Sequence, residues 1–312
     1  MINKEYKDRL FVKLFGREEH RDWILSLYNA INGTSYTDAA AIEINTMEDV
    51  VYMGMKNDVS FLLGCEMNVY EHQSSYNPNM PVRMLSYLGM LYRKHVLKSG
   101  RMIYGAKPVA VPLPKLAVFY NGNEDVPDET ILHLHDAFPK GVDKNLADVN
   151  VRVRMLNINY DHNRALMEAC KPLSEYAWFV DKVREYKNAM DLEAAIDKTL
   201  NEMPGEYAIR EYLIGNRSEV KMDFLTEYNE AEVMAYLREE AKEEGREEGS
   251  VLKLIRQVRR KLAKGKDADT IADELEEEPE QIEEIIDAIR AAGEDADAEA
   301  VYRKLRTKET VA

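Results

Sequence analysis

The sequence has little cysteine and no long apolar run, and each absence excludes a class of protein. Its 312 residues include only Cys65 and Cys170, too few for a disulfide scaffold or for a structural zinc site of four thiolates. No apolar run approaches the roughly 20 residues that cross a bilayer, and residues 1–16 carry charges instead of the apolar core of a signal peptide. We therefore expect a cytoplasmic protein that has no membrane partner.

Acidic residues are missing from one long stretch of an otherwise acidic chain. The net charge is −15, which argues against a generic nucleic-acid binder because such proteins are usually basic. Residues 73–123, however, contain no Asp or Glu, and they carry the seven bases Arg83, Arg93, Lys94, Lys98, Arg101, Lys107 and Lys115. This distribution predicts a local positive surface that could face an anionic partner.

Hydrophobic periodicity in the first 122 residues predicts an α/β fold. Apolar residues recur at helical spacing over two segments, 18–31 and 81–96. Strand-like runs occupy 41–55, 59–64, 66–74 and 115–122, and an alternating run at 151–159 predicts a further strand. The order is helix, three strands, helix, strand, and short hairpin links between strands predict a mixed central sheet flanked by helices.

Composition divides the chain into three parts. We expect an α/β core over residues 1–162, a helical region packed on or beside it over 163–230, and an acidic helical tail over 231–312. The tail begins with 231–250, which is nearly all Ala, Glu, Lys and Arg and predicts an extended solvated helix or a linker. Three short amphipathic helices follow, and we expect them to mediate self-association or contacts with another protein, because the acidic residues of the last one would repel nucleic-acid phosphates.

Two carboxylates form the candidate functional site. Asp58 begins one predicted strand and Glu71 lies near the end of the next, so hairpin pairing would bring them together, with Gln73 on the same face as Glu71. Carboxylates, a backbone carbonyl and water suit Mg²⁺, or Mn²⁺ in its place, and such an ion assists phosphate hydrolysis. Ordinary solvated hairpins also carry two acids, so spacing alone leaves both interpretations open. Glu66 competes for the same role, but its parity places it on the opposite face from Glu71.

Three blocks of the sequence resemble a known nuclease family. KNDVSF, YEHQSSYNPNMPVRMLSYLGMLY and PKLAVFYNG are similar to the recombination-promoting nuclease and transposase-like family, a branch of the PD-(D/E)xK superfamily. The resemblance covers residues 4–230 and implies a restriction-endonuclease-like core, Mg²⁺-dependent DNA endonuclease activity and DNA as the partner. It also implies that Asp58, Glu71 and Gln73 are catalytic and that Asp58, Glu71 and the backbone carbonyl of His72 hold the metal.

The chain departs from the superfamily at one catalytic position. Gln73 stands where the superfamily usually has lysine, and an amide can hold water but supplies no positive charge. The metal would have to supply that charge. The alternative is therefore a nuclease-fold protein with little or no catalytic activity that acts by binding DNA or protein.

The basic residues after the Glu-x-Gln motif are candidates for DNA binding. They lie on the predicted helix 81–96 and its exit, and they are Arg83, Arg93, Lys94, Lys98 and Arg101. A solvated polar face would have the same composition, and the family resemblance favours a phosphate-binding surface. Arg83 lies two residues after Pro81, in the first turn, and is the candidate nearest to the strand end. His133 and His135 lie in a polar, helix-like context in which we expect no metal site.

Overall fold

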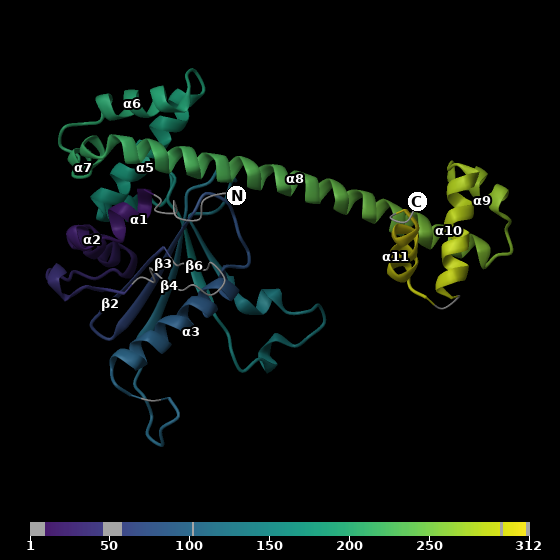
Figure 1. Ribbon diagram of the computed structural model, residues 1–312, viewed down its shortest axis with the longest axis horizontal. Coiled ribbons are helices and arrows are strands. Elements are labelled where there is room, and N and C mark those ends of the chain that lie inside the picture. The colour runs from purple at the N-terminus through teal and green to yellow at the C-terminus, as the bar shows by residue number, and fades with distance from the viewer. Residues whose placement is uncertain (1–9, 46–57, 102, 294–295, 310–312) are drawn as a thin grey trace. The chain divides into compact units, whose positions relative to one another are not determined.

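A computed structural model describes residues 10–45, 58–101, 103–293 and 296–309, without the side chains of 226–241, 244, 247 and 306–309. The chain divides into two compact units, Met1–Ala231 and Glu232–Ala312. Helix α8 (Arg217–Leu262) contributes residues to both (Figure 1). Within these described residues, no helix combines the length and the apolar character needed to cross a lipid bilayer.

The first unit is built around a six-stranded sheet. Its strands are β1 (Glu43–Ile44), β2 (Val59–Leu63), β3 (Glu66–Gln73), β4 (Leu113–Tyr120), β5 (Glu129–His133) and β6 (Arg152–Asn157). Its helices before α8 are α1 (Leu10–Phe15), α2 (Arg21–Asn32), α3 (Met80–Lys98), α4 (Arg164–Ala169), α5 (Lys171–Lys187), α6 (Leu192–Glu202) and α7 (Arg210–Gly215). Short 3-10 helices are η1 (Glu18–His20), η2 (Ala39–Ala41), η3 (Leu134–Ala137) and η4 (Lys144–Leu146).

The sheet is mixed, as the hairpin links predict. The strand order is β1-β2-β3-β4-β6-β5, with β2 and β3 antiparallel, β4 parallel to both β3 and β6, and β5 antiparallel to β6. Gly64, at φ 58°, makes the tight turn between β2 and β3, in a left-handed conformation that favours glycine. Parallel strands need a crossover, and α3 supplies it between β3 and β4. The predicted α/β class and the order helix, three strands, helix, strand are both confirmed.

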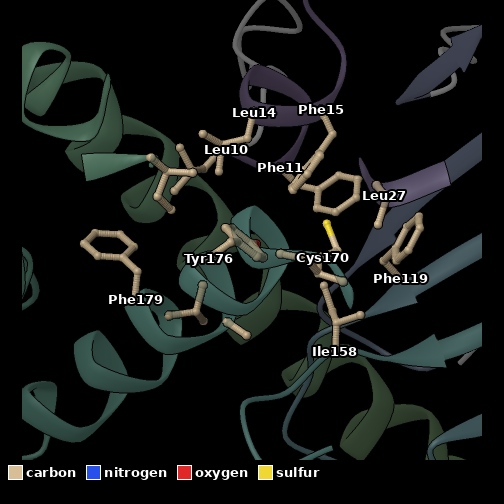
Figure 2. Packing of buried hydrophobic residues seen from close by; sticks show 14 of the residues in the cluster. Leu10, Phe11, Leu14, Phe15, Leu27, Phe119, Ile158, Cys170, Tyr176 and Phe179 are labelled. Carbon is tan, nitrogen blue, oxygen red and sulfur yellow. The ribbon is translucent and has the colours of Figure 1, made fainter. Parts of the chain in front are cut away.

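One face of the sheet packs against helices from both ends of the first unit. Figure 2 shows this core, in which Phe11 of α1 lies 5.0 Å from Phe119 of β4 and 5.9 Å from Tyr176 of α5, between ring centroids. Cys170 is fully buried in the same cluster, and Val220 brings α8 into it. The helices α4 to α7 therefore share one core with the sheet and do not form a core of their own.

The other face of the sheet is covered by α3, as Figure 1 shows. Met84, Tyr87 and Leu91 lie on successive turns of this helix and are buried against strand residues such as Val69 and Val118. Because β3 lies between these two layers, its residues from Met67 onward are all buried. Successive side chains of β3 therefore enter two different cores.

Several elements were not predicted from the sequence, because they are short or have no clear amphipathic pattern. Six-residue α1 is nearly all apolar, so it shows no helical period, and β5 has polar ends and a single buried residue, Leu132. The expected helix-like context holds for His135, which lies in the 3-10 helix η3, but is wrong for His133, which ends β5; the two imidazole centroids are 4.6 Å apart. Of the strand expected over 41–55, β1 is described and 46–57 lie outside the described residues.

The second unit is a small helical core of its own. It contains the end of α8, α9 (Ala268–Leu275), α10 (Pro279–Ala292) and α11 (Ala298–Glu309). Its buried residues include Ile255, Ile271, Ile282 and Val301. Helix α8 runs without a break through the charged segment 231–250, where a solvated helix or a linker was expected, and α11 was not predicted.

The first unit should fold without the second. Among the α8 residues whose side chains are described, those that contact its core precede residue 225: Val220 is buried, Phe224 packs on Phe179, and Lys13 is ion-paired with Asp223 at 2.9 Å. A chain ending after Ala231 keeps all of them. We expect it to unfold cooperatively at the midpoint of the first unit in the full chain, followed by tryptophan fluorescence, since both tryptophans lie in this unit.

A chain ending after Asn216 is the matched control for this truncation. It leaves Lys13, whose side chain is 9% exposed, without Glu219 and Asp223. An unpaired buried charge costs about 3–5 kcal/mol, so this shorter chain should be strongly destabilised. Equal stability of the two truncated chains, or a non-cooperative transition for the longer one, would contradict the boundary.

Candidate functional site

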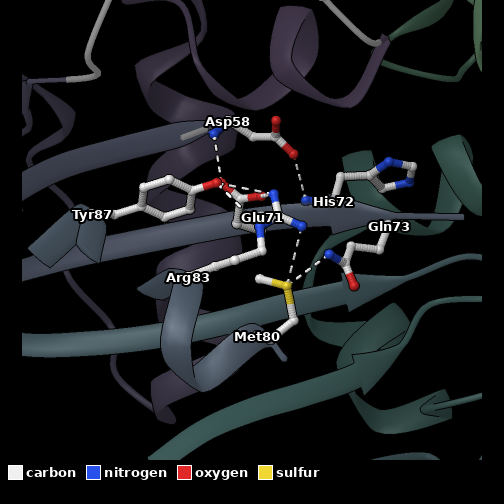
Figure 3. Close-up of polar contacts among 7 residues, drawn as sticks. All are labelled: Asp58, Glu71, His72, Gln73, Met80, Arg83 and Tyr87. Atoms are coloured by element: carbon white, nitrogen blue, oxygen red, sulfur yellow. Dashed lines mark hydrogen bonds and ion pairs between the residues drawn. The ribbon is translucent and has the colours of Figure 1, made fainter. Parts of the chain in front are cut away.

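Asp58 and Glu71 lie side by side where β2 begins and β3 ends. In the ladder Val59 pairs with Tyr70, so Asp58 falls opposite Glu71 on the face covered by α3. Each carboxylate accepts a backbone hydrogen bond from the other strand: Glu71 Oε1 from Asp58 N at 3.0 Å, and Asp58 Oδ2 from His72 N at 2.7 Å (Figure 3). These reciprocal bonds fix the two carboxylates relative to each other.

Arg83 neutralises Glu71 from above the sheet. The Glu71 side chain is 2% exposed, and its Oε2 accepts a hydrogen bond from Arg83 Nη2 at 3.0 Å. The same guanidinium donates from Nε and Nη2 to the Tyr87 hydroxyl at 3.3 and 3.0 Å. Tyr87 lies one turn beyond Arg83 on α3, so the helix presents both groups together to Glu71, as Figure 3 shows.

Burial and charge act in opposite directions on this arginine. Burial alone lowers the pKa of the Arg83 guanidinium, but the charge of Glu71 and the hydrogen bond with Tyr87 act against it, and the pKa lies above its ordinary value. For Tyr87 the two effects agree, because burial and then the Glu71 charge raise the pKa of its phenol. Arg83 is therefore a cation and Tyr87 a neutral hydroxyl near pH 7.

Gln73 lies on the same face as Glu71, two residues further along β3. Its Nε2 contacts the Met80 sulfur at 2.7 Å, at the first residue of α3. Its Oε1 is buried and has no hydrogen-bond partner among the described residues. A buried amide oxygen without a partner is unfavourable and is usually satisfied by water or an ion. The site therefore contains one hard oxygen atom that can accept a ligand.

Glu66 and His72 are even-numbered residues of β3, so their side chains lie on the face opposite to Glu71 and Gln73. Glu66 accepts a hydrogen bond from the Tyr28 hydroxyl of α2 at 2.8 Å, at the far end of β3 from Asp58. The His72 ring stacks on Phe11 at 5.1 Å between centroids, and its Nε2 forms a 3.0 Å hydrogen bond with the Tyr176 hydroxyl. The carboxylate beside Asp58 is thus Glu71, and only the backbone of His72 faces the site.

The remaining basic candidates lie further along α3. Arg83, Lys94 and Lys98 share one flank of the helix, and Lys98 is about 22 Å from Arg83 at 1.5 Å per residue. Lys94 Nζ donates to the Asn45 carbonyl at 3.3 Å, beside β1. Arg93 lies on the exposed outer side of α3, and Arg101 follows the end of the helix. The structure brings Arg83 to the two carboxylates and leaves the other four bases away from them.

The basic stretch contains no acidic residues, but the fold brings acidic residues from other parts of the chain beside it. In pairs between described residues, three of its seven bases contact carboxylates that precede the stretch in the chain: Arg83 with Glu71, Lys98 with Glu43 and Lys115 with Glu66. All three acids come from β1 or β3, which lie beside the basic residues in the fold. The positive surface is therefore smaller than the sequence suggests.

Three aromatic residues that were not predicted from the sequence contact Arg83 or His72. Tyr87 anchors Arg83, while Phe11 and Tyr176 hold His72 from behind β3. The spacing of Arg83 and Tyr87, four residues apart on a predicted helix, was a usable signal for the first. Phe11 and Tyr176 come from segments 60 or more residues away from His72 in the chain, and no local pattern indicates such contacts.

The donor atoms at this site fit a hard divalent cation. Two adjacent carboxylates and the unpartnered Gln73 Oε1 are the oxygen ligands that Mg²⁺ and Mn²⁺ prefer. Among the residues that the structure describes, no group of three or more His, Cys, Asp and Glu side chains could hold a metal ion. A cation here would therefore rely on two carboxylates, amide or backbone oxygens, and water.

Comparison with known proteins adds no family to this description. No family model, no curated protein and no solved structure matches the chain.

The hydrogen bond behind β3 should contribute measurably to stability. Tyr176→Phe removes the hydroxyl that binds His72 Nε2, both residues being 1% exposed, and should lower the free energy of unfolding by about 1–2 kcal/mol. Tyr212→Phe is the matched control, because the Tyr212 hydroxyl is buried without a partner among the described residues. It should be neutral or stabilising. Urea denaturation measures both, and equal effects would show that the His72 contact carries no specific stabilisation.

Proposed function

We propose that this chain is a metal-dependent DNA endonuclease with a restriction-endonuclease-like core. The supporting observation is the Asp58–Glu71 pair, fixed by reciprocal backbone hydrogen bonds at the end of β3, with Gln73 on the same face. The mixed sheet flanked by helices supports the proposal, because the resemblance to the recombination-promoting nuclease and transposase-like family implies such a sheet. That resemblance rests on the three sequence blocks alone.

In the proposed hydrolysis, different residues bind the metal ion and orient the attacking water. Asp58, Glu71 and the backbone carbonyl of His72 would hold Mg²⁺, or Mn²⁺ in its place, and the unpartnered Gln73 Oε1 would be left for water. When bound, such an ion supplies positive charge to the phosphate and acidifies water. The water oxygen then adds to phosphorus while one P–O ester bond breaks, leaving a phosphomonoester end and a hydroxyl end. Gln73 is the residue placed to orient that water.

One observation favours a second function, binding without cleavage. Glu71 is already neutralised by Arg83, and Gln73 supplies no charge where the superfamily has lysine. A protein with this site could bind DNA or a protein partner and leave the phosphodiester intact. The cleavage assay separates the two functions.

Metal-dependent cleavage should require Asp58 and Glu71 but not Glu66. Asp58→Asn and Glu71→Gln each remove one negative charge from the site, and either should lower Mg²⁺-dependent nicking of plasmid DNA at least 100-fold, in line with the loss of a charged catalytic group. Glu66→Gln is the matched control, because it removes the same charge from the same strand on the opposite face. If Glu66→Gln lost activity and Glu71→Gln kept it, the catalytic carboxylate would be Glu66 and the assignment to Glu71 would be wrong.

We propose that the flank and exit of α3 hold the DNA backbone. Arg93, Lys94, Lys98 and Arg101 are exposed on α3 or after it, and Arg83, 37% exposed, lies at the end nearest the carboxylates. The net charge of −15 opposes long-range attraction of DNA, so affinity would come from these local contacts. Such contacts fix the position of a duplex but do not read its sequence.

Affinity for duplex DNA should fall steeply with salt. Each phosphate contact contributes a log–log slope of about −0.9, so four or five contacts weaken binding by roughly 150- to 500-fold between 50 and 200 mM salt. Arg93→Ala should flatten the slope by about one unit. Arg164→Ala on α4 is the control, since it removes an exposed arginine from the opposite side of the sheet. If substitution of all five bases left the slope of log affinity against log salt concentration unchanged, this flank would be an ordinary solvated surface that does not bind DNA.

We further propose that the second unit mediates self-association. Its apolar residues are buried in its own core, so charged side chains remain to contact a second copy. The end of α8 is basic, with Arg256, Arg259, Arg260 and Lys261, whereas the exposed residues of α10 include Glu280, Glu283 and Glu284. The chain ending after Ala231 tests this, because it would be monomeric under conditions in which the full chain is not.

A further inference from the structure

The Glu71 carboxylate is the most strongly constrained charge of the site. Its side chain is 2% exposed, and an ionised carboxylate buried without a partner costs several kcal/mol. Its Oε1 accepts the Asp58 backbone N–H, which carries no net charge. Among the described residues, Arg83 supplies a compensating positive charge, at 3.0 Å from Oε2.

The contacts of Arg83 allow its guanidinium to move away from Glu71. Its Nε and Nη2 both donate to the Tyr87 hydroxyl, and Nη1 contacts the Met80 sulfur at 3.5 Å. The arginine side chain is nevertheless 37% exposed, whereas Tyr87 is 2% exposed. The guanidinium can therefore swing into water on its flexible stem without uncovering the core.

A divalent cation between Asp58 and Glu71 would compete with this arginine. Glu71 Oε2 already accepts the arginine N–H, and two cations a few ångströms apart repel each other strongly in a partly buried site. Either Arg83 leaves when the cation binds, or it stays and weakens the binding. In both cases Arg83 lowers the affinity of the site for the cation.

We propose that Arg83 is a resident counter-ion of Glu71 that a divalent cation must displace, so that it sets the cation concentration at which the site loads. This inference rests on the proposed function, since it takes Asp58 and Glu71 as the cation ligands. It assigns Arg83 a positioning role toward Glu71, in addition to any contact with a DNA phosphate. A structural arginine would help the site to form, and its loss would weaken cation binding; a counter-ion has the opposite effect.

The test is Mn²⁺ affinity of the full chain without DNA, measured by the EPR signal of free Mn²⁺ at 150 mM salt. Arg83→Met keeps the length and apolar stem of the side chain and removes the charge. It should bind Mn²⁺ about tenfold more tightly than the wild type, which corresponds to the loss of one competing charge-assisted hydrogen bond. The half-maximal Mg²⁺ concentration for DNA cleavage should fall in parallel.

Arg93→Met is the matched control for net charge. It removes one positive charge from the exposed side of the same helix, ten residues from Arg83, and its screened effect on Mn²⁺ affinity should be less than twofold. Tyr87→Phe gives a second variant in which Arg83 remains but loses its anchor. It should tighten Mn²⁺ binding by a few-fold, and it keeps the proposal testable if Arg83→Met does not fold.

The outcomes separate this inference from the proposed function. If Glu71→Gln abolishes Mn²⁺ binding while Arg83→Met leaves it unchanged or weaker, the cation site stands and the counter-ion role is wrong. If the folded Glu71→Gln variant binds Mn²⁺ as tightly as the wild type, the cation is not held by Glu71, and both the proposed site and the counter-ion role fail. Tighter binding in Arg83→Met but not in Arg93→Met supports the counter-ion.

Discussion

The alternation of side chains along β3 is the constraint on which the first unit depends. β3 is buried between two layers, so each step along it changes the core that the side chain enters. Odd-numbered Glu71 and Gln73 face α3, whereas even-numbered Tyr70 and His72 face the layer that contains α1 and α5. A register shift of one residue would exchange these sets and place polar groups against the aromatic core.

This alternation also explains why the two sides of β3 differ chemically. On the α1 and α5 side, the aromatic rings of Phe11 and Phe119 and the Tyr176 hydroxyl enclose His72 and leave little space for change. On the α3 side, the polar residues at the strand end meet one helix whose first turn carries Arg83. The aromatic layer packs on His72 behind β3, and the reciprocal backbone hydrogen bonds hold Glu71 beside Asp58.

A buried carboxylate needs a positive partner, and among the described residues Arg83 is such a partner for Glu71. If a cation takes the place of Arg83, the carboxylate remains neutralised while the guanidinium becomes available to an anion. Under the proposed function, the absence of a lysine at position 73 and the presence of Arg83 are then connected. The positive charge that Gln73 does not supply on β3 is present one loop later, on α3, but it is directed at Glu71.

The sequence predicts the parts of this structure that local patterns encode. The β2–β3 hairpin, the parity that separates Glu66 from Glu71, and the long helix after Pro81 all follow from residue spacing. The pairing of Arg83 with Glu71 does not, because it depends on how the loop between β3 and α3 closes. The short strand β5 and the packing of α1 on His72 are likewise set by contacts between segments distant in the chain.

The charge of the basic stretch shows the same limit. A run without acids describes the chain, but the field at a surface depends on which acids the fold brings beside it, and here Glu43, Glu66 and Glu71 come from neighbouring strands. At 0.1 M salt the screening length is about 10 Å, roughly half the distance of about 22 Å from Arg83 to Lys98. The two ends of this flank therefore act almost independently of each other and of the net charge of −15. Whether the flank attracts a phosphate backbone depends on these local pairings.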